Sequence, residues 1–295
     1  MTDQAPKVVA EIGCNHKGEM SIAKEMIATA ALYCKADYVK FQKRNNRELL
    51  PKEQYDAPHP NALNSYGDTY GAHREFLEFD VDQHRELMDY CEEMSIGYST
   101  SVWDVTSAKE MSALQPDFLK VPSASNLHWD MLDVLCGEFS GGIQLSLGMT
   151  TRDEEEQIVK FFEDRGRAKD LLMYACTSGY PVEFNDICLL EITRLRETFG
   201  GRVQSVGFSG HHLGIAADIA AIALGATWVE RHFTMDRTWK GTDHAASLEA
   251  DGLRKLVRDV RNVSKALKYK ETELLPVELE TRKKLKWHTG SASAS

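Results

Sequence analysis

Short apolar runs alternate with amphipathic stretches along most of the chain. The runs are rich in valine, isoleucine and aromatic residues, whereas in the stretches between them apolar residues recur at spacings of three and four. The first pattern is typical of buried strands and the second of helices at a surface, so their alternation indicates parallel βα units. We predict strands at 8–13, 38–42, 97–102, 118–123, 143–148, 171–177, 203–209 and 228–234.

Helices are expected between these strands. The helical pattern is clearest at 20–33, 81–94, 105–113, 153–163, 189–198, 215–224 and 253–267. Asp104, Thr150 or Thr151, and Asn185 lie just upstream of three of these segments, where a short polar side chain can accept hydrogen bonds from free backbone N–H groups. Each of these residues is therefore a candidate helix cap.

Eight such units predict a closed (β/α)8 barrel, the TIM barrel of the α/β class, as a single domain. An open doubly wound sheet is the alternative, but it normally uses about five to seven strands and would leave part of the chain unexplained. We expect the barrel to occupy residues 1–270 and a C-terminal extension to occupy 271–295. The tail 288–295, rich in serine and alanine, is expected to be unstructured.

One long insertion interrupts the alternation after the second predicted strand, at 43–80. Loops of this length inside a compact domain are usually functional or disordered. The insertion carries Tyr66, Tyr70, Phe76 and Phe79 among its polar residues. This aromatic content favours an ordered segment that packs over another part of the protein.

Composition narrows the function classes. The 295 residues are 42% hydrophobic and 27% charged, which is a globular composition. With 35 basic against 45 acidic side chains the net charge is −10, so the chain lacks the basic footprint of a nucleic-acid-binding protein. No apolar run is long enough to span a membrane, and the six cysteines are scattered without metal-site spacing. We expect a soluble cytoplasmic protein with reduced thiols and neither nucleic-acid nor membrane partners.

Polar residues gather where the predicted strands end. In a barrel these ends and the loops that follow them surround the mouth at which ligands bind. The residues at these positions are Glu11, Lys40, Gln42, Thr100, Lys120, Ser123, Ser146, Thr177, Ser178, Tyr180, Ser209, His211, Glu230, His232, Asp243 and His244. Every predicted strand contributes, so a shared site at the mouth is expected.

Two lysines lie inside strands, Lys40 and Lys120. Burying an ammonium group is costly without an anion beside it. One interpretation is a salt bridge to a core carboxylate such as Glu11 or Glu230. The other, favoured because two lysines occur together with serine and threonine hydroxyls, is a site for a phosphate or carboxylate ligand.

His211 and His232 end two neighbouring strands. Their imidazoles, with a carboxylate such as Glu11, suit a divalent metal ion, for which the transition ion Mn²⁺ is the first choice and Mg²⁺ or Co²⁺ are alternatives. A structural histidine is the commoner role for one such residue alone. Tyr180 could contact a polyol or cap the core, and Cys14 and Cys176 are expected to be packing residues rather than nucleophiles.

With these residues assembled, the sequence resembles the sialic acid synthase (NeuB) family. The resembling stretches are AEIGCNHKGE at 10–19, VKFQK at 39–43, SYGDTYGAHREFLEF at 65–79, LKVPSAS at 119–125, CTSGYP at 176–181, GFSGHHLGIA at 207–216 and ERHFTMDRTWKGTDHAASLE at 230–249. The resemblance implies condensation of phosphoenolpyruvate with N-acetylmannosamine, its 6-phosphate or a related N-acyl sugar. Where many bacterial members read HCTN and SDH, this chain reads ACTS and SGH, which resembles members that make the 9-phosphate.

Roles for individual residues follow from the resemblance. It implies that His211 and His232 hold the metal and act in catalysis. It implies that phosphoenolpyruvate is surrounded by Lys40, Thr100, Lys120, Ser123, Ser146, Ser178 and Ser209. The sugar side would be served by Glu11, Gln42, Tyr180 and Asp243. Apart from the resemblance, the proton carrier is expected to be Glu11 or a metal-bound water.

The resemblance also implies a homodimer. Family members continue into an antifreeze-like domain that reaches the partner's barrel, whereas this sequence ends soon after LETRKKLKW at 279–287. We therefore expect a barrel without that domain, which a separate antifreeze-like protein could supply. A catalytically incomplete binding barrel and a metal-dependent pyruvate aldolase remain as alternative functions.

Overall fold

Eight parallel strands close into a barrel in the computed structural model, which describes residues 5–287. The strands are β1 (Lys7–Gly13), β2 (Tyr38–Lys43), β3 (Gly97–Val102), β4 (Phe118–Val121), β5 (Gly142–Ser146), β6 (Leu171–Cys176), β7 (Ser205–Gly210) and β8 (Trp228–His232). Each strand pairs with the next along the chain, and β1 also pairs with β8. The prediction of a closed barrel rather than an open sheet is confirmed.

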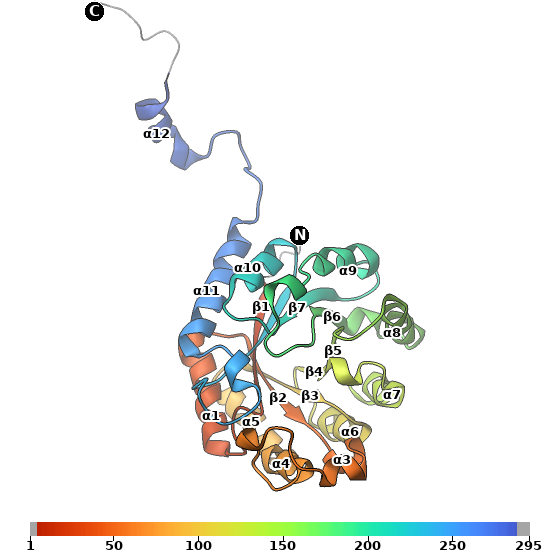
Figure 1. Cartoon of the computed structure of the whole chain (residues 1–295). Coiled ribbons are helices and arrows are strands. Elements are labelled where there is room, and N and C mark those ends of the chain that lie inside the picture. The colour runs from red at the N-terminus through yellow and green to blue at the C-terminus, as the bar shows by residue number, and fades with distance from the viewer. Residues whose placement is uncertain (1–4, 288–295) are drawn as a thin grey trace, which may run out of the picture. The chain divides into compact units, whose positions relative to one another are not determined.

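Helices surround the strands on the outside (Figure 1). They are α1 (Met20–Ala28), α5 (Val81–Glu93), α6 (Val105–Leu114), α7 (Trp129–Glu138), α8 (Arg152–Asp164), α9 (Glu191–Phe199), α10 (Ala216–Ala223) and α11 (Ala250–Ala266). The predicted helix at 20–33 is in part a π-helix, because α1 passes into η1 (Thr29–Cys34). The other predicted helices match to within a few residues at their ends.

The predicted helix caps are confirmed at two of three places. Asp104 accepts a hydrogen bond from the backbone N–H of Ser107 at 2.7 Å. Of the two threonines it is Thr151 that caps α8, in a reciprocal capping box with Glu154. The prediction for Asn185 is wrong, because a short 3₁₀ turn (Phe184–Asp186) occupies that position and α9 begins only at Glu191.

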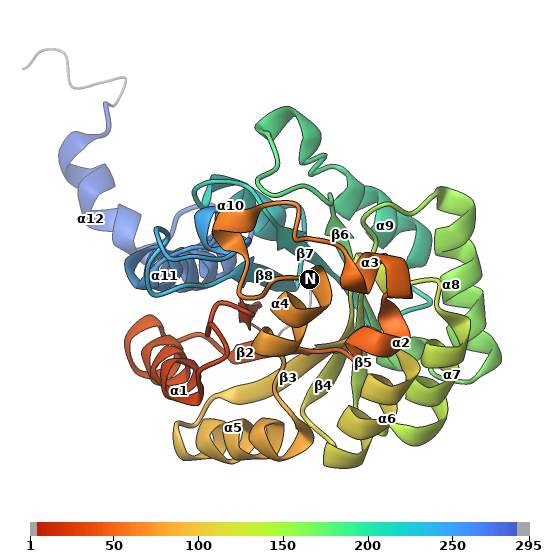
Figure 2. The ribbon, with the colours of Figure 1, turned by 60° about the horizontal axis from the view of Figure 1, so that its bottom comes forward.

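The insertion after β2 is ordered, as its aromatic residues indicate. It forms α2 (Asn46–Leu49), α3 (Lys52–Asp56), the 3₁₀ turn η2 (Ala62–Asn64) and α4 (Tyr70–Leu77). Figures 1 and 2 show α3 and α4 as neighbours on one side of the barrel. Tyr66 and Phe76 stack with their ring centroids 5.0 Å apart. The Tyr66 hydroxyl donates to the carbonyl of Lys240, which joins the insertion to the loop after β8.

The two ends of the barrel differ in chemistry. Three aromatic side chains, Tyr38, Phe118 and Trp228, stand at the starts of β2, β4 and β8 with ring centroids 5.1–5.5 Å apart. This aromatic layer fills the end at which the strands begin. Polar and charged side chains collect at the opposite end, which leaves that end for a ligand.

The compact barrel unit ends at Ser264, and a second unit begins at Lys265. In the second unit, Lys270 in the loop before α12 (Pro276–Leu285) pairs with Glu278 in the first turn of that helix, with Nζ and Oε1 2.8 Å apart. The tail 288–295, expected to be unstructured, lies outside the described residues. Within residues 5–287, no helix has the length and apolar character needed to cross a membrane. All six cysteines are free thiols.

Candidate active site

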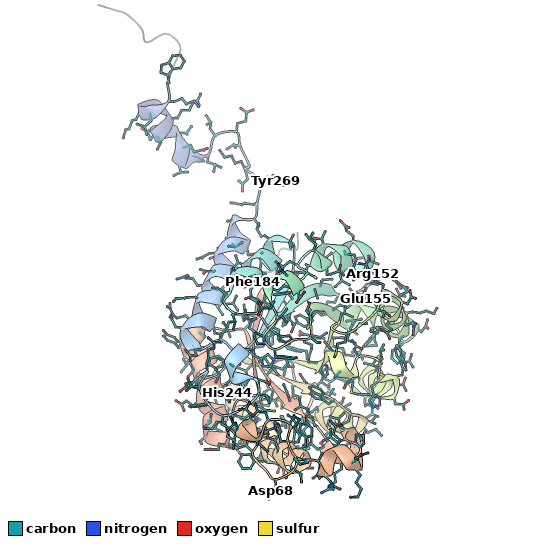
Figure 3. The ribbon with its side chains drawn as sticks, in the orientation of Figure 1. Asp68, Arg152, Glu155, Phe184, His244 and Tyr269 are labelled. Carbon is teal, nitrogen blue, oxygen red and sulfur yellow. The ribbon has the colours of Figure 1, made fainter. Side chains whose placement is uncertain are left out.

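A pocket of about 610 Å³ opens at the end of the barrel where the strands finish. Figure 3 labels two residues of the segments that approach this end, Asp68 on the insertion and His244 after β8. Almost every residue predicted for the site lines this pocket: Glu11, Lys40, Gln42, Lys120, Ser123, Ser146, Ser178, Tyr180, Ser209, His211, His232 and Asp243. Residues from strands far apart in sequence are thus brought together as expected.

Thr177 and His244, also expected near the mouth, do not line this pocket, and neither does Thr100, whose placement the structure corrects. In the register of the sheet Thr100 is opposite Phe41 and Leu119, whose side chains belong to the apolar core between strands and helices. Side chains alternate along a strand, so the next residue, Ser101, faces the barrel interior instead. Ser101 lines the pocket and lies opposite Lys120 in the register, so it replaces Thr100 in the candidate site.

Both lysines are paired with buried carboxylates. Lys40 contacts Glu11 and donates a hydrogen bond to Ser101 Oγ at 2.7 Å. Lys120 Nζ lies 3.0 Å from each carboxylate oxygen of Glu230, and Lys40 Nζ lies 3.8 Å from Glu230. The salt-bridge interpretation of the lysines is therefore confirmed. Lys40 and Lys120 nonetheless also line the pocket.

The charges in this cluster depend on one another. Burial lowers the pKa of Lys120, and the neighbouring Lys40 lowers it further, while Glu230 opposes both effects. Burial alone would raise the pKa of Glu230, but Lys120 and Lys40 bring it to about 2. Glu230 is therefore ionised at neutral pH, and it also accepts a hydrogen bond from Ser209 Oγ at 3.0 Å.

A break in strand register places Glu11. The pairing of β1 with β2 shifts between Glu11 and Gly13, and Gly13 has a positive φ of 57°. A Cβ at Gly13 would stand 3.0 Å from Gln42 Nε2 and 3.1 Å from Glu11 Oε1. These two groups hydrogen-bond to each other at 2.7 Å. Glycine is required here both by the backbone and by the space that the Glu11–Gln42 pair occupies.

Hydroxyl groups converge on the opposite side of the pocket, after β4, β5 and β6. Ser123 Oγ accepts a hydrogen bond from the backbone N–H of Gly148 at 3.0 Å. A Cβ at Gly148 would stand 2.2 Å from Ser178 Oγ and 2.7 Å from Ser123 Oγ. The missing side chain at Gly148 thus leaves room for two hydroxyls and one backbone amide to meet, an arrangement suited to an anion.

The two predicted metal ligands are neighbours at the ends of β7 and β8. The ring centroids of His211 and His232 are 5.6 Å apart, and the Tyr180 ring is 4.3 Å from that of His211. His211 Nδ1 lies 3.1 Å from the carbonyl oxygen of Thr177. We assign the proton to this nitrogen, which leaves the Nε2 lone pair of His211 free.

Electrostatics keep this pair able to bind a cation. Burial, reinforced by His232, lowers the pKa of His211 to about 4, so its imidazole is neutral at neutral pH. His232 Nδ1 is buried without a hydrogen-bond partner and lies 3.9 Å from Asp243 Oδ2. Glu11, the carboxylate expected to join them, is instead held by Lys40 and Gln42. Among residues 5–287 no three His, Cys, Asp or Glu side chains are grouped as ligands for one ion.

From the sequence alone, Lys43, Arg44 and Arg74 near the mouth could bind a sugar phosphate, but solvated surface charges are the commoner role for such residues. The structure contradicts the surface role for both arginines. Arg44 and Arg74 line the pocket, with only 7% and 12% of their side chains exposed. Arg44 stacks on Trp103, with its guanidinium carbon 3.9 Å from the ring centroid. Lys43, considered with them, lies outside this pocket and pairs with Glu110 at 3.3 Å. No local sequence signal separates these arginines from surface charges, because the fold of the insertion buries them.

Comparison with known proteins places the chain among nonulosonic acid synthases. The model of the NeuB family matches residues 26–272. N-acetylneuraminate-9-phosphate synthase of Homo sapiens is 37% identical over 94% of this chain and 76% of that protein. N,N'-diacetyllegionaminic acid synthase of Campylobacter jejuni is 30% identical over 88% of this chain and 77% of that protein.

The solved structures agree with the sequence relatives. The crystal structure of N-acetylneuraminic acid (sialic acid) synthetase from Leptospira borgpetersenii, in complex with citrate, superposes with a TM-score of 0.80 at 26% identity. The match covers 96% of this chain and 93% of that one. From the family match, the relatives and the shared barrel together, we conclude that this chain belongs to the NeuB family.

Proposed function

We propose that the protein is a C–C bond-forming synthase that condenses phosphoenolpyruvate with an N-acyl amino sugar. N-acetylmannosamine or its 6-phosphate is the foremost acceptor, and the products are a nonulosonic acid and inorganic phosphate. One observation carries the proposal: two lysines, two imidazoles and two serine hydroxyls lie in one pocket of a NeuB-family barrel. We call the two hydroxyls, those of Ser123 and Ser178 beside Gly148, the hydroxyl cradle. Each of the relatives compared above is named as a synthase of an acid of this class.

Phosphoenolpyruvate fits the side of the pocket formed by β4, β5 and β6. There the Ser123 and Ser178 hydroxyls can donate hydrogen bonds to an anionic oxygen, and the Gly148 N–H, which donates to Ser123 Oγ, orients the Ser123 hydroxyl. Lys120, from β4, lines the same pocket. In this position the ligand's nucleophilic carbon faces the strands β7 and β8, where the histidines lie.

Gly148→Ala is expected to raise the KM for phosphoenolpyruvate by about 10-fold or more. Its Cβ would collide with Ser178 Oγ and Ser123 Oγ, which must move out of the cradle and lose about two hydrogen bonds to the anion. Steady-state phosphate release at varied phosphoenolpyruvate measures this effect. Gly137→Ala is the matched control, because nothing lies within 4 Å of a Cβ at that helical position. An unchanged KM would place phosphoenolpyruvate elsewhere in the pocket.

The residues present fit a divalent cation at His211 and His232. His211 keeps a free Nε2 lone pair, and His232 Nδ1 is an orphaned buried nitrogen. Two imidazoles suit Mn²⁺, with Mg²⁺ and Co²⁺ as alternatives, and they leave further coordination positions to substrate and water. When bound, the ion would act as a Lewis acid on a carbonyl group.

Charge balance gives an independent reason for a cation. Lys40 and Lys120 are offset by Glu11 and Glu230, so the deep cluster carries no net charge. Phosphoenolpyruvate carries both a phosphate and a carboxylate, and these paired groups offer little net attraction to it. A divalent cation held by His211 and His232 would add positive charge on the β7–β8 side of the pocket, away from Arg44 and Arg74.

The chain's own groups then arrange the reaction. Lys120 and the hydroxyl cradle hold phosphoenolpyruvate with C3 toward the aldehyde carbon of the open-chain sugar, and this positioning removes much of the entropic barrier. C3 forms the new bond, water adds at C2, and the tetrahedral carbon expels phosphate. Glu11, held by Lys40 and Gln42, is placed to carry a proton between water and the sugar oxygen.

Purified protein incubated with Mn²⁺, phosphoenolpyruvate and either acceptor sugar tests the function directly. We expect stoichiometric release of phosphate and a nonulosonic acid. Absence of phosphate release with both sugars overturns the proposal for those acceptors. Product formed from pyruvate without phosphate release would identify an aldolase. Turnover only after addition of a separate antifreeze-like domain would identify an incomplete barrel.

A further inference from the structure

Arg74 is a nearly buried cation with few partners. It lies on α4 in the insertion, lines the pocket, and makes one hydrogen bond among residues 5–287, to Cys14 Sγ at 3.9 Å. Burial raises the pKa of the Cys14 thiol, so this partner is uncharged at neutral pH. A guanidinium has five N–H donors, and leaving them unpaired in a sheltered site is costly. Arg74 is therefore available for an oxygen-rich ligand.

A second arginine stands beside it and shares its counter-ion. Glu78 Oε1 lies 3.3 Å from Arg44 Nη1 and 3.6 Å from Arg74 Nη2. Glu78 also accepts the backbone N–H of Arg44, and the Arg44 guanidinium donates to Gln42. One carboxylate thus holds two guanidinium groups in place and neutralises only one of them. Asp243 is a second acidic group at this corner: it interacts electrostatically with both arginines, and its Oδ2 lies 3.9 Å from His232 Nδ1.

The place of this corner in the barrel suggests its ligand. Arg44 follows β2, and Arg74 contacts Cys14, which follows β1. In the closed order of strands, β1 and β2 lie across the mouth from β5 and β6, where we place phosphoenolpyruvate. The histidines of β7 and β8 lie between the two. An open-chain hexosamine carries its carbonyl and its C6 at opposite ends.

We propose that Arg44 and Arg74 form a subsite for the 6-phosphate of the acceptor sugar. The inference rests on the proposed function: with the carbonyl end at the histidines, the C6 end extends toward the β1–β2 side of the pocket. Two guanidinium groups can hold a phosphate through several charge-assisted hydrogen bonds, which a hydroxyl at C6 cannot replace. The protein therefore selects the phosphorylated N-acyl hexosamine over the unphosphorylated one.

Arg74→Gln tests the subsite through substrate preference. The ratio of kcat/KM for N-acetylmannosamine 6-phosphate to that for N-acetylmannosamine is expected to fall about 100-fold, because about two charge-assisted hydrogen bonds are lost. Arg74→Lys keeps the charge and should recover part of the ratio. Arg85→Gln, on the exposed face of α5, is the matched control and should keep the wild-type ratio. A ratio within about threefold of wild type in Arg74→Gln overturns the proposal.

Two further measurements separate this inference from other outcomes. If the arginines bind phosphoenolpyruvate instead, Arg74→Gln raises the KM for phosphoenolpyruvate equally with both sugars, and the proposal is overturned. Calorimetry with the two sugars decides the subsite even if no turnover occurs. Tighter binding of the 6-phosphate to wild type than to Arg74→Gln supports the subsite, whereas equal affinity of wild type for both sugars overturns it. Thermal unfolding of each variant verifies that it is folded.

Discussion

Replacing His211 with alanine is expected to reduce phosphate release to below about one thousandth of the wild-type rate. The substitution removes one of two neighbouring imidazoles and with it the free Nε2 lone pair. Loss of the cation would remove both the polarisation of the carbonyl and the positive charge that the paired lysines do not provide. Ser178→Ala removes a single hydroxyl from the cradle and is expected to cost only about 10-fold.

Metal binding provides a second readout that does not depend on turnover. Titration of the apoprotein with Mn²⁺, followed by electron paramagnetic resonance, should show binding that weakens by about 100-fold or more in His211→Ala. His128→Ala, a histidine outside the pocket, is the control and should bind Mn²⁺ as wild type does. Equal Mn²⁺ affinity in His211→Ala and wild type would refute the assignment of this ligand. Full turnover in the presence of a chelator would refute the need for a cation.

The strand pattern was predictable because buried parallel strands are short, continuous and rich in β-branched residues. Polar residues at the ends of such runs are conspicuous against that background, which is why the lysines and histidines of the pocket could be found. Register cannot be found in the same way, since a shift of one residue changes which face a side chain occupies. Thr100 and Ser101 differ by one position, and only the pairing with Lys120 decides between them.

Neither the ion-pair partners of the buried lysines nor the fold of the insertion could be predicted fully from the sequence. The helices α2 and α3 contain too few turns for a helical period to be recognised. The burial of Arg44 and Arg74 depends on how the whole insertion folds, including α4, on which Arg74 lies. The partners of Lys40 and Lys120 were narrowed to Glu11 and Glu230 from the sequence, but the structure was needed to show that both carboxylates take part.

Glu230→Ala is expected to lower the free energy of unfolding by about 3–5 kcal/mol, because it leaves the buried Lys120 without a counter-ion. Glu230 also accepts a hydrogen bond from Ser209 Oγ and lies 3.8 Å from Lys40 Nζ. Its removal therefore affects three buried polar side chains at once. Urea denaturation of wild type and variant measures the difference. Glu86→Ala, which removes a carboxylate from an exposed pair with Lys24, is the control and should not shift the midpoint measurably.

A double substitution separates stability from catalysis at this position. Lys120→Met combined with Glu230→Met removes both charges together, and replacing a buried ion pair by apolar side chains of similar size is often neutral for stability. We expect the double variant to regain most of the unfolding free energy lost in Glu230→Ala while phosphate release stays abolished. A double variant that unfolds as readily as Glu230→Ala would mean that packing, rather than charge pairing, explains the loss. Recovery of stability without turnover would show that the chain retains this costly buried pair for its chemistry.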